Sequence, residues 1–183
     1  MKMLAFFMVI FLGWVNLNFL PKPEVFYTNN GSVTMLMSLN MGKTIATTNS
    51  ANSVYEPATD KVDFVVDLKT FQFSNILIEY QFKETYLEVS KYPNVTFKGR
   101  MRSKVDMQSK AIQKVWIDGF LDMHGVIQKR TILAEVKCLD NQIYVKSDFT
   151  IRPAEHKIAI PAAFFTEEKD IIDIHFEGHY SKK

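Results

Sequence analysis

Cysteine is almost absent from this chain of 183 residues, with Cys138 as the sole example. No internal disulfide can form, so a buried core has to supply the stability. The segment "EVKCLD" places Cys138 at the end of an apparent strand, with no partner for nucleophilic chemistry in the local sequence. We therefore expect Cys138 to be a small buried hydrophobe.

Several catalytic and binding signatures are also missing. The sequence contains no Gly-x-Ser-x-Gly, His-Glu-x-x-His or Cys-x-x-Cys motif and no glycine-rich phosphate loop. The formal charge is only +2, and the densest basic cluster is "QKR" at Gln128 to Arg130, which is too little for a nucleic-acid footprint. We predict a non-enzymatic protein with no metal, no cofactor and no nucleic-acid partner.

The histidines are the remaining candidates for catalysis or metal binding. His175 and His179 share one face of the last apparent strand, but positions four apart on a strand lie about 13 Å from each other. That distance is too long for two ligands of one ion, so a solvated outer face is expected. A hydrolase or metal enzyme would require His124, His156, His175 or His179 to converge with carboxylates.

Long apolar runs are limited to Met3–Val15, which follows the positive charge of Lys2. This length suits the core of a signal peptide and falls short of the roughly 20 residues of a membrane-spanning helix. We predict a cleaved signal peptide over residues 1–20, one domain over 21–183, and a periplasmic or secreted location. An uncleaved N-terminal anchor is the alternative.

Alternation of apolar and polar residues dominates the rest of the chain and predicts strands. A further strand, Ser32–Asn40, follows a turn-type sequence at Asn29–Gly31, and His124 with Gly125 would form another tight turn. The alternating apolar positions are Val62, Phe64, Val66 and Leu68; Val95 and Phe97; Val115, Ile117, Gly119 and Leu121; Ile143, Val145 and Phe149; and Ile172, Ile174 and Phe176.

The expected fold class is all-β with a minor α content. About eight antiparallel strands with short connections predict a closed β-barrel or a sandwich, and composition does not choose between them. Two short helices are predicted, one over residues 82–92 that ends before Pro93, and one over Pro161–Asp170.

Methionines allow two interpretations. Met35, Met37 and Met41 could bind Cu(I) in an exported protein. Met35 and Met37 also share an apolar strand face with Val33 and Leu39, and lining of a core or pocket is the favoured interpretation.

Two segments resemble the YceI-like family of exported, lipocalin-resembling proteins. They are "FQFSNILIEYQFKETYLEVSKYPNVTFKG" (71–99) and "IDGFLDMHGVIQKRTI" (117–132). Residues 149–178 resemble the family more loosely. The matching motif positions are Tyr92, Pro93 and Phe97 in the first segment, and Gly119, Leu121, His124, Gly125 and Val126 in the second.

The resemblance implies a barrel that binds a polyisoprenoid or another lipid. The chain departs from the family at Gln81, where members often have His, and at Asp122, where they have Thr. The family's Arg-x-Asp-Phe-Gly pattern is missing near residues 149–160. These departures indicate a divergent branch and leave the ligand open.

We therefore expect non-catalytic binding of an isoprenoid, quinone or fatty-acid-like molecule, for storage or transport in the cell envelope. The short helix would cover the barrel interior with Phe82, Tyr86 and Leu87. The alternative is a closed barrel that serves as an interaction or stress-protective module without a lipid, and a homodimer stays open. The predicted ligand-binding residues are Phe64, Val66, Phe82, Ile117, Val145, Phe149, Ile174 and Phe176.

Overall fold

The computed structural model describes residues 24–40, 42–140, 142–161, 164 and 170–183. Strands make up most of this part of the chain. They are β1 (Phe26–Leu39), β2 (Gly42–Glu56), β3 (Lys61–Asp67), β4 (Gln72–Phe73), β5 (Asn94–Met101), β6 (Gln113–Met123), β7 (Val126–Leu139), β8 (Gln142–Ile151) and β9 (Ile172–Lys182).

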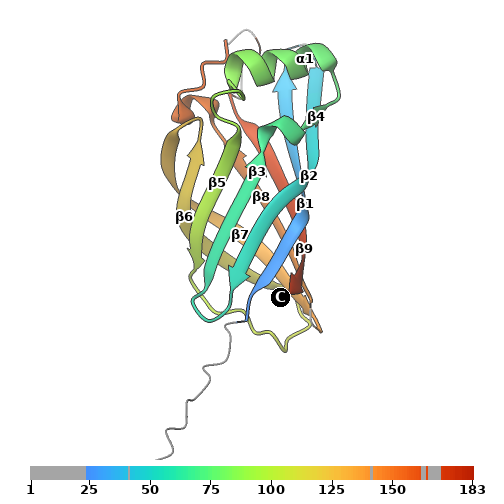
Figure 1. Cartoon of the computed structure of the whole chain (residues 1–183), viewed down its shortest axis with the longest axis vertical. Coiled ribbons are helices and arrows are strands. Elements are labelled where there is room, and N and C mark those ends of the chain that lie inside the picture. Colours follow the sequence, from blue (N-terminus) through green and yellow to red (C-terminus); the bar gives the residue numbers. More distant parts are fainter. Residues whose placement is uncertain (1–23, 41, 141, 162–163, 165–169) are drawn as a thin grey trace, which may run out of the picture.

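The sheet closes on itself, which settles the choice between barrel and sandwich. The strand order is β1-β9-β8-β7-β6-β5-β3-β2-β4, and an additional pairing of β1 with β2 completes the ring. Every pairing is antiparallel. The two-residue β4 lies outside the ring on the edge of β2, so the barrel has eight strands, as predicted (Figure 1).

One long connection, between β3 and β5, covers one end of the barrel (Figure 1). It contains a 3₁₀ turn, η1 (Leu68–Thr70), then β4, the helix α1 (Ile76–Tyr80) and a π-helical segment, η2 (Gln81–Tyr86). The amide of Leu68 donates to the carbonyl of Pro93 over 2.7 Å, which ties the two ends of the connection together. We call residues 68–93 the lid, and the end of the barrel that it covers the lid end.

The helical segment begins earlier than residue 82 and ends before residue 92. Its start is set by Asn75, whose side chain accepts hydrogen bonds from the amides of Leu77 and Ile78. Glu88, with a φ of 43°, turns the chain out of the helix before Pro93 is reached. The predicted boundaries were wrong because the sequence analysis missed this cap, whereas the predicted inward face of Phe82, Tyr86 and Leu87 is confirmed.

The turn predicted at Asn29–Gly31 is also wrong, because these residues lie within β1. The pairing of β1 with β2 shifts register between Thr28 and Gly31, and the hydroxyl of Thr28 donates to the side-chain oxygen of Asn30 over 3.0 Å. The segment therefore forms a bulge. A glycine is needed there, because a Cβ on Gly31 would lie 2.9 Å from the ring of Phe176.

Three other predictions fall wholly or largely outside the described residues. They concern the signal peptide over residues 1–20, Met41, and most of the helix expected over Pro161–Asp170. Within the described residues, no helix has the length and apolar character needed to cross a membrane.

Alternation decides which side chains enter the barrel. On β6, Val115, Ile117 and Leu121 are buried, whereas Trp116 and Phe120 between them are exposed. Gly119 keeps the inward register but has no side chain, and the ring of Phe97 from β5 occupies that space. The β6–β7 turn at His124 and Gly125 has positive φ at both positions, as predicted for a two-residue hairpin.

Replacing Gly119 with Ala should therefore destabilise the barrel. The new methyl group would lie 2.5 Å from both the carbonyl oxygen of Lys98 and the Phe97 ring, so β5 and β6 would have to separate. We expect a loss of about 1–3 kcal/mol in the free energy of unfolding, measured by urea denaturation. The outward substitution Asp122→Ala on the same strand should change it by less than about 0.5 kcal/mol, and equal effects would contradict the packing argument.

Candidate functional site: an apolar cavity under a lid

The barrel encloses a cavity of about 120 Å³. Its walls come from all eight strands of the ring and from the start of the lid, and no lining residue carries a charge. The lining residues are Val33, Met35, Ser53, Val62, Phe64, Val66, Leu68, Phe71, Val95, Phe97, Ile117, Leu121, Met123, Ile132, Ala134, Val145, Ser147, Phe149, Ile151, Ile172, Ile174, Phe176 and Tyr180.

Aromatic rings set the shape of this space. Phe64 and Phe176 meet edge to face with their centroids 5.4 Å apart, from β3 and β9 on different sides of the barrel. Phe64, Val145 and Phe149 pack against the core but are only partly buried, because one side of each borders the empty space of the cavity. These three residues have the most room to contact a ligand.

Polar atoms on the wall are few, and their protons are already engaged. The hydroxyl of Ser53 donates to the carbonyl of Asp63 over 2.9 Å, and that of Ser147 donates to the carbonyl of Leu133 over 2.8 Å. Burial raises the pKa of Tyr180 to about 12, so its phenol is neutral at physiological pH. The wall thus offers a guest a few acceptor lone pairs and no charge.

Seven of the eight residues predicted to bind a ligand line this cavity. Phe82 is the exception, since it is buried above the cavity within the lid. That the seven contact a ligand stays a prediction. The seven are Phe64, Val66, Ile117, Val145, Phe149, Ile174 and Phe176.

Four aromatic rings pack in a chain around the lid, and none of them lines the cavity. Phe82 lies 5.8 Å from Phe73 and 5.5 Å from Tyr86, and Tyr86 lies 5.6 Å from Phe164, all between ring centroids. We call these four residues the aromatic plug. Because three of them belong to the lid, a movement of the lid would displace most of the plug.

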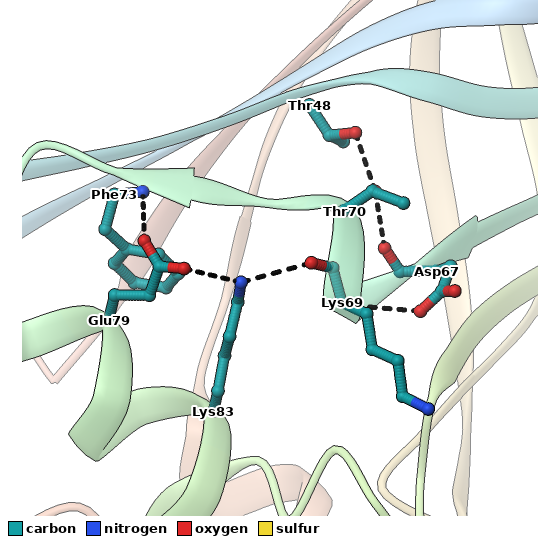
Figure 2. Close-up of polar contacts among 7 residues, drawn as sticks. All are labelled: Thr48, Asp67, Lys69, Thr70, Phe73, Glu79 and Lys83. Carbon is teal, nitrogen blue, oxygen red and sulfur yellow. Dashed lines mark hydrogen bonds and ion pairs between the residues drawn. The ribbon is translucent and has the colours of Figure 1, made fainter. Parts of the chain in front are cut away.

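A polar network holds the lid to the barrel at η1 (Figure 2). The amide of Lys69 donates to the carboxylate of Asp67 over 2.8 Å, and the hydroxyl of Thr70 donates to the Asp67 carbonyl over 2.7 Å. Since the Thr70 proton is used there, Thr48 of β2 is the donor in the 2.7 Å contact between the two threonine hydroxyls. This contact fixes η1 against the barrel wall.

The same network reaches the helix through Glu79 and Lys83 (Figure 2). The Nζ of Lys83 lies 2.7 Å from the Glu79 carboxylate and donates to the carbonyl of Lys69 over 3.1 Å. The other oxygen of Glu79 accepts from the amide of Phe73 over 3.1 Å. The hydrogen bonds from Lys83 and from the Phe73 amide lower the pKa of Glu79, which therefore stays ionised.

The far end of the lid is tied to the barrel through two histidines. His124 stacks on Tyr92 at 4.3 Å, and its Nε2 lies 2.9 Å from the carboxylate of Glu88. The Nδ1 of His124 lies 3.3 Å from the carbonyl of His156, whose own Nδ1 is 3.1 Å from the carbonyl of Val126. His156 is fully buried in the 3₁₀ turn η3 (Pro153–His156), so these residues lock the lid to the β6–β7 turn.

The other two histidines lie on the outer surface of β9. His175 contacts the carboxylates of Asp148 at 2.5 Å and Glu177 at 3.0 Å, and His179 stacks on Tyr144. They do not converge with His124 and His156. Among the described residues, no three His, Cys, Asp or Glu side chains are grouped to hold a metal ion.

Among the described residues, the methionines of β1 and the single cysteine belong to the core. Met35 and Met37 are buried on the inward face of β1, and Met35 borders the cavity. Cys138 is buried on β7, with its thiol 3.9 Å from the sulfur of Met107, and burial raises the pKa of that thiol. These positions agree with the predicted role of Met35, Met37 and Cys138 as apolar residues of the core or pocket lining.

Parts of the cavity lining on β7 were not predicted from the sequence. Ile132 and Ala134 continue an alternation on that strand that could have been recognised. Ser53 and Ser147 gave no signal, because a polar residue at an inward position looks like an outward one when only hydropathy is considered.

The fold and the cavity define a lidded, lipocalin-like barrel with an uncharged interior. A family model for the YceI-like domain matches residues 26–179. The chain belongs to the YceI-like family, as the sequence motifs indicated. A comparison with proteins of curated function finds no match.

Solved structures share this fold at low sequence identity. A polyisoprenoid-binding domain from Saccharophagus degradans, implicated in plant cell wall breakdown, superposes with a TM-score of 0.73 at 14% identity, covering 88% of this chain and 100% of the other. Burkholderia cenocepacia BcnA superposes with a TM-score of 0.60 at 14% identity, covering 82% of this chain and 94% of the other. The Campylobacter jejuni YceI protein superposes with a TM-score of 0.60 at 18% identity, covering 75% of this chain and 84% of the other.

The histidines predict a specific pH dependence of stability. Burial lowers the pKa of His156, so as the pH falls below 6.5 the unfolded chain takes up a proton that the folded protein does not, and stability decreases. The hydrogen bond to Asp148 raises the pKa of His175. Protonated His175 therefore adds to the free energy of unfolding below pH 6.5, and this stabilisation is lost as the pH rises through the folded-state pKa.

Removing His175 should therefore expose the effect of His156. As the pH falls from about 7.5 to about 5, the free energy of unfolding of His175→Gln should decrease more steeply than that of the parent. Urea denaturation at each pH measures this. The control is Thr150→Val at an exposed position of β8, which removes no titratable group and should keep the parent's profile. An unchanged profile in His175→Gln would contradict the assignment.

Proposed function

We propose that the barrel binds the apolar part of a hydrophobic small molecule, such as an isoprenoid chain, a quinone or a fatty-acid-like molecule. The uncharged cavity is the observation that carries this proposal. The polyisoprenoid-binding domain of the same fold supports it. No charged residue lines the cavity, so burial of apolar surface supplies the driving force for binding.

The magnitude of this driving force is large for a chain-like ligand. Each methylene removed from water contributes about 0.8 kcal/mol, so a five-carbon isoprene unit contributes roughly 4 kcal/mol when fully buried. The cavity of about 120 Å³ is slightly smaller than the roughly 150 Å³ of an engineered cavity that binds benzene. It admits the end of a chain without rearrangement.

A longer ligand needs more room, and the structure indicates where it is gained. Rotation of Phe64 and Phe176 out of their edge-to-face contact would widen the cavity between β3 and β9. Displacement of the aromatic plug would extend it to the lid end. We therefore expect affinity to rise with chain length and association to slow once the plug has to move.

The head group of such a ligand is restricted by the same wall. A phosphate or carboxylate would be desolvated inside the barrel with no cation to pair with it. The buried part is therefore uncharged, and an ionic head group would remain in water beyond the lid.

Storage or transport of this ligand in the cell envelope is part of the proposal. It rests on the apolar run Met3–Val15, which has the character of an export signal. Under this proposal the protein is not an enzyme, because binding requires no chemical step.

A second candidate is a protein-interaction module, and exposed apolar residues on the lid favour it. Ile76, Leu77 and Tyr80 of α1 are 79%, 75% and 69% exposed. Such a cluster is unusual on a surface without a partner. This candidate requires no ligand in the cavity, so the experiment below separates the two.

Filling the cavity should abolish binding. Val145 borders the empty space, so Val145→Phe would occupy it with a phenyl ring while adding apolar contacts to the core. We expect at least a tenfold loss of affinity for prenols of increasing length, measured by equilibrium binding of labelled compounds, with little loss of thermal stability.

The matched control is Val65→Phe on β3, which makes the same change on the outer face between the inward residues Phe64 and Val66. It should bind like the parent. Undiminished binding by a folded Val145→Phe protein would exclude the cavity as the binding site, and failure of the parent to bind any prenol, quinone or fatty acid would favour the interaction module.

A further inference from the structure

The outer surface of the β6–β7 hairpin carries an apolar stripe that the cavity does not explain. Trp116, Phe120 and Ile127 are 47%, 57% and 63% exposed. Trp116 and Phe120 point outward because their neighbours Ile117 and Leu121 line the cavity, and Asp118 lies between them on the same face. Ile127 pairs with Asp122, which places it diagonally next to Phe120 on the same face. We call Trp116, Phe120 and Ile127 the β6–β7 stripe.

Lysines flank this stripe on both sides. Phe120 pairs with Lys98 of β5 on one side and with Lys129 of β7 on the other, so the three residues form one row across the sheet. Arg100 follows on β5 on the same outward face as Lys98. Within the part of the chain that the structure describes, no carboxylate lies within ion-pair distance of these three cations.

The neighbouring acidic groups do not cancel this charge. Asp118 is engaged by Arg102, with contacts of 2.7 and 2.8 Å, and by the hydroxyl of Thr131 at 2.6 Å. Asp122 is the other carboxylate on this face of β6. Lys114 and Glu135, an ion pair of 3.4 Å beside Trp116, offset each other. The other charges around the stripe are Lys98, Arg100, Arg102 and Lys129 against Asp118 and Asp122, a net charge of +2. On the far side of β5, Lys61 and Asp63 pair with Arg100 and Lys98 and offset each other.

We propose that this face docks on an anionic membrane surface. Exposed Trp and Phe combined with lysines is the composition of the bilayer interface, where rings enter the head-group region and ammonium groups reach the phosphates. A protein partner fits less well, because lysine is depleted in protein–protein interfaces. The surface is the convex outside of a barrel, to which a deformable lipid surface can adapt.

This inference is independent of the proposed cargo. The stripe lies outside the barrel wall, and none of its three residues borders the cavity. A barrel with or without a bound lipid would present the same stripe. The experiment can therefore fail or succeed separately from the binding experiment with prenols.

The test uses Trp116 as its own probe. The chain has two tryptophans, Trp14 and Trp116, so the full-length variant Trp14→Phe leaves the stripe residue as the sole tryptophan, which is excited selectively at wavelengths that tyrosine does not absorb. The protein is mixed with phosphatidylcholine vesicles that contain brominated acyl chains and an increasing fraction of phosphatidylglycerol. Quenching of Trp116 reports contact of the stripe with the bilayer, even if residues before the barrel are themselves membrane-bound.

We expect quenching that increases with phosphatidylglycerol and is reversed by high salt. The double variant Lys98→Gln/Lys129→Gln should weaken the contact by roughly 25-fold, since each lysine near an anionic surface contributes about fivefold. The control Lys43→Gln/Lys69→Gln removes two exposed lysines elsewhere and should retain the quenching.

Phe120→Ser should weaken the contact as well, while Ile112→Ser, at an exposed apolar residue outside the stripe, should not. Absence of Trp116 quenching at every phosphatidylglycerol fraction would overturn the proposal. So would quenching that is equal in the parent and in the Lys98→Gln/Lys129→Gln variant. Either result would favour a protein partner as the explanation of the exposed β6–β7 stripe.

Discussion

The pairing of β1 with β2 is the constraint on which the rest of this structure depends. It closes the ring of eight strands, because β1 begins the strand order next to β9, whereas β2 is the last ring strand at the other end of that order. Closure leaves no free edge in the ring and divides every strand into an inward and an outward face. The cavity is a consequence of this division, since eight strands leave an interior just wide enough for side chains or one small ligand.

The connection from β3 to β5 shows how the ends of the barrel are used. β3 pairs only with residues 52–56 of β2, so the first half of β2 needs another neighbour on that side. The lid supplies it through β4, which pairs with Ala46 and Thr47, and through η1. The lid therefore both completes the wall of the barrel and covers its interior. The polar network of Asp67, Thr70, Glu79 and Lys83 holds the lid to the barrel at one end (Figure 2). The contact of His124 with Glu88 holds it at the other end.

The alternation of side chains on long strands could be predicted from the sequence, because burial on one face imposes a period of two. Seven inward positions were placed correctly for this reason. The bulge at Asn29–Gly31 was missed because it depends on the pairing of β1 with β2, which hydropathy does not show. The Asn75 cap was missed although it is local, because a polar cap residue leaves no trace in a hydropathy pattern. The size of the cavity was also beyond prediction, because it is set by which rings, such as Phe64 and Phe176, pack against each other.

The central claim is that the cavity holds a hydrophobic guest, and the most direct measurement is native mass spectrometry of protein purified from its own host. The account predicts a stoichiometric adduct of defined mass that organic solvent releases and that contains an apolar chain. A single mass equal to that of the polypeptide, unchanged after incubation with isoprenoids, quinones and fatty acids, would contradict it.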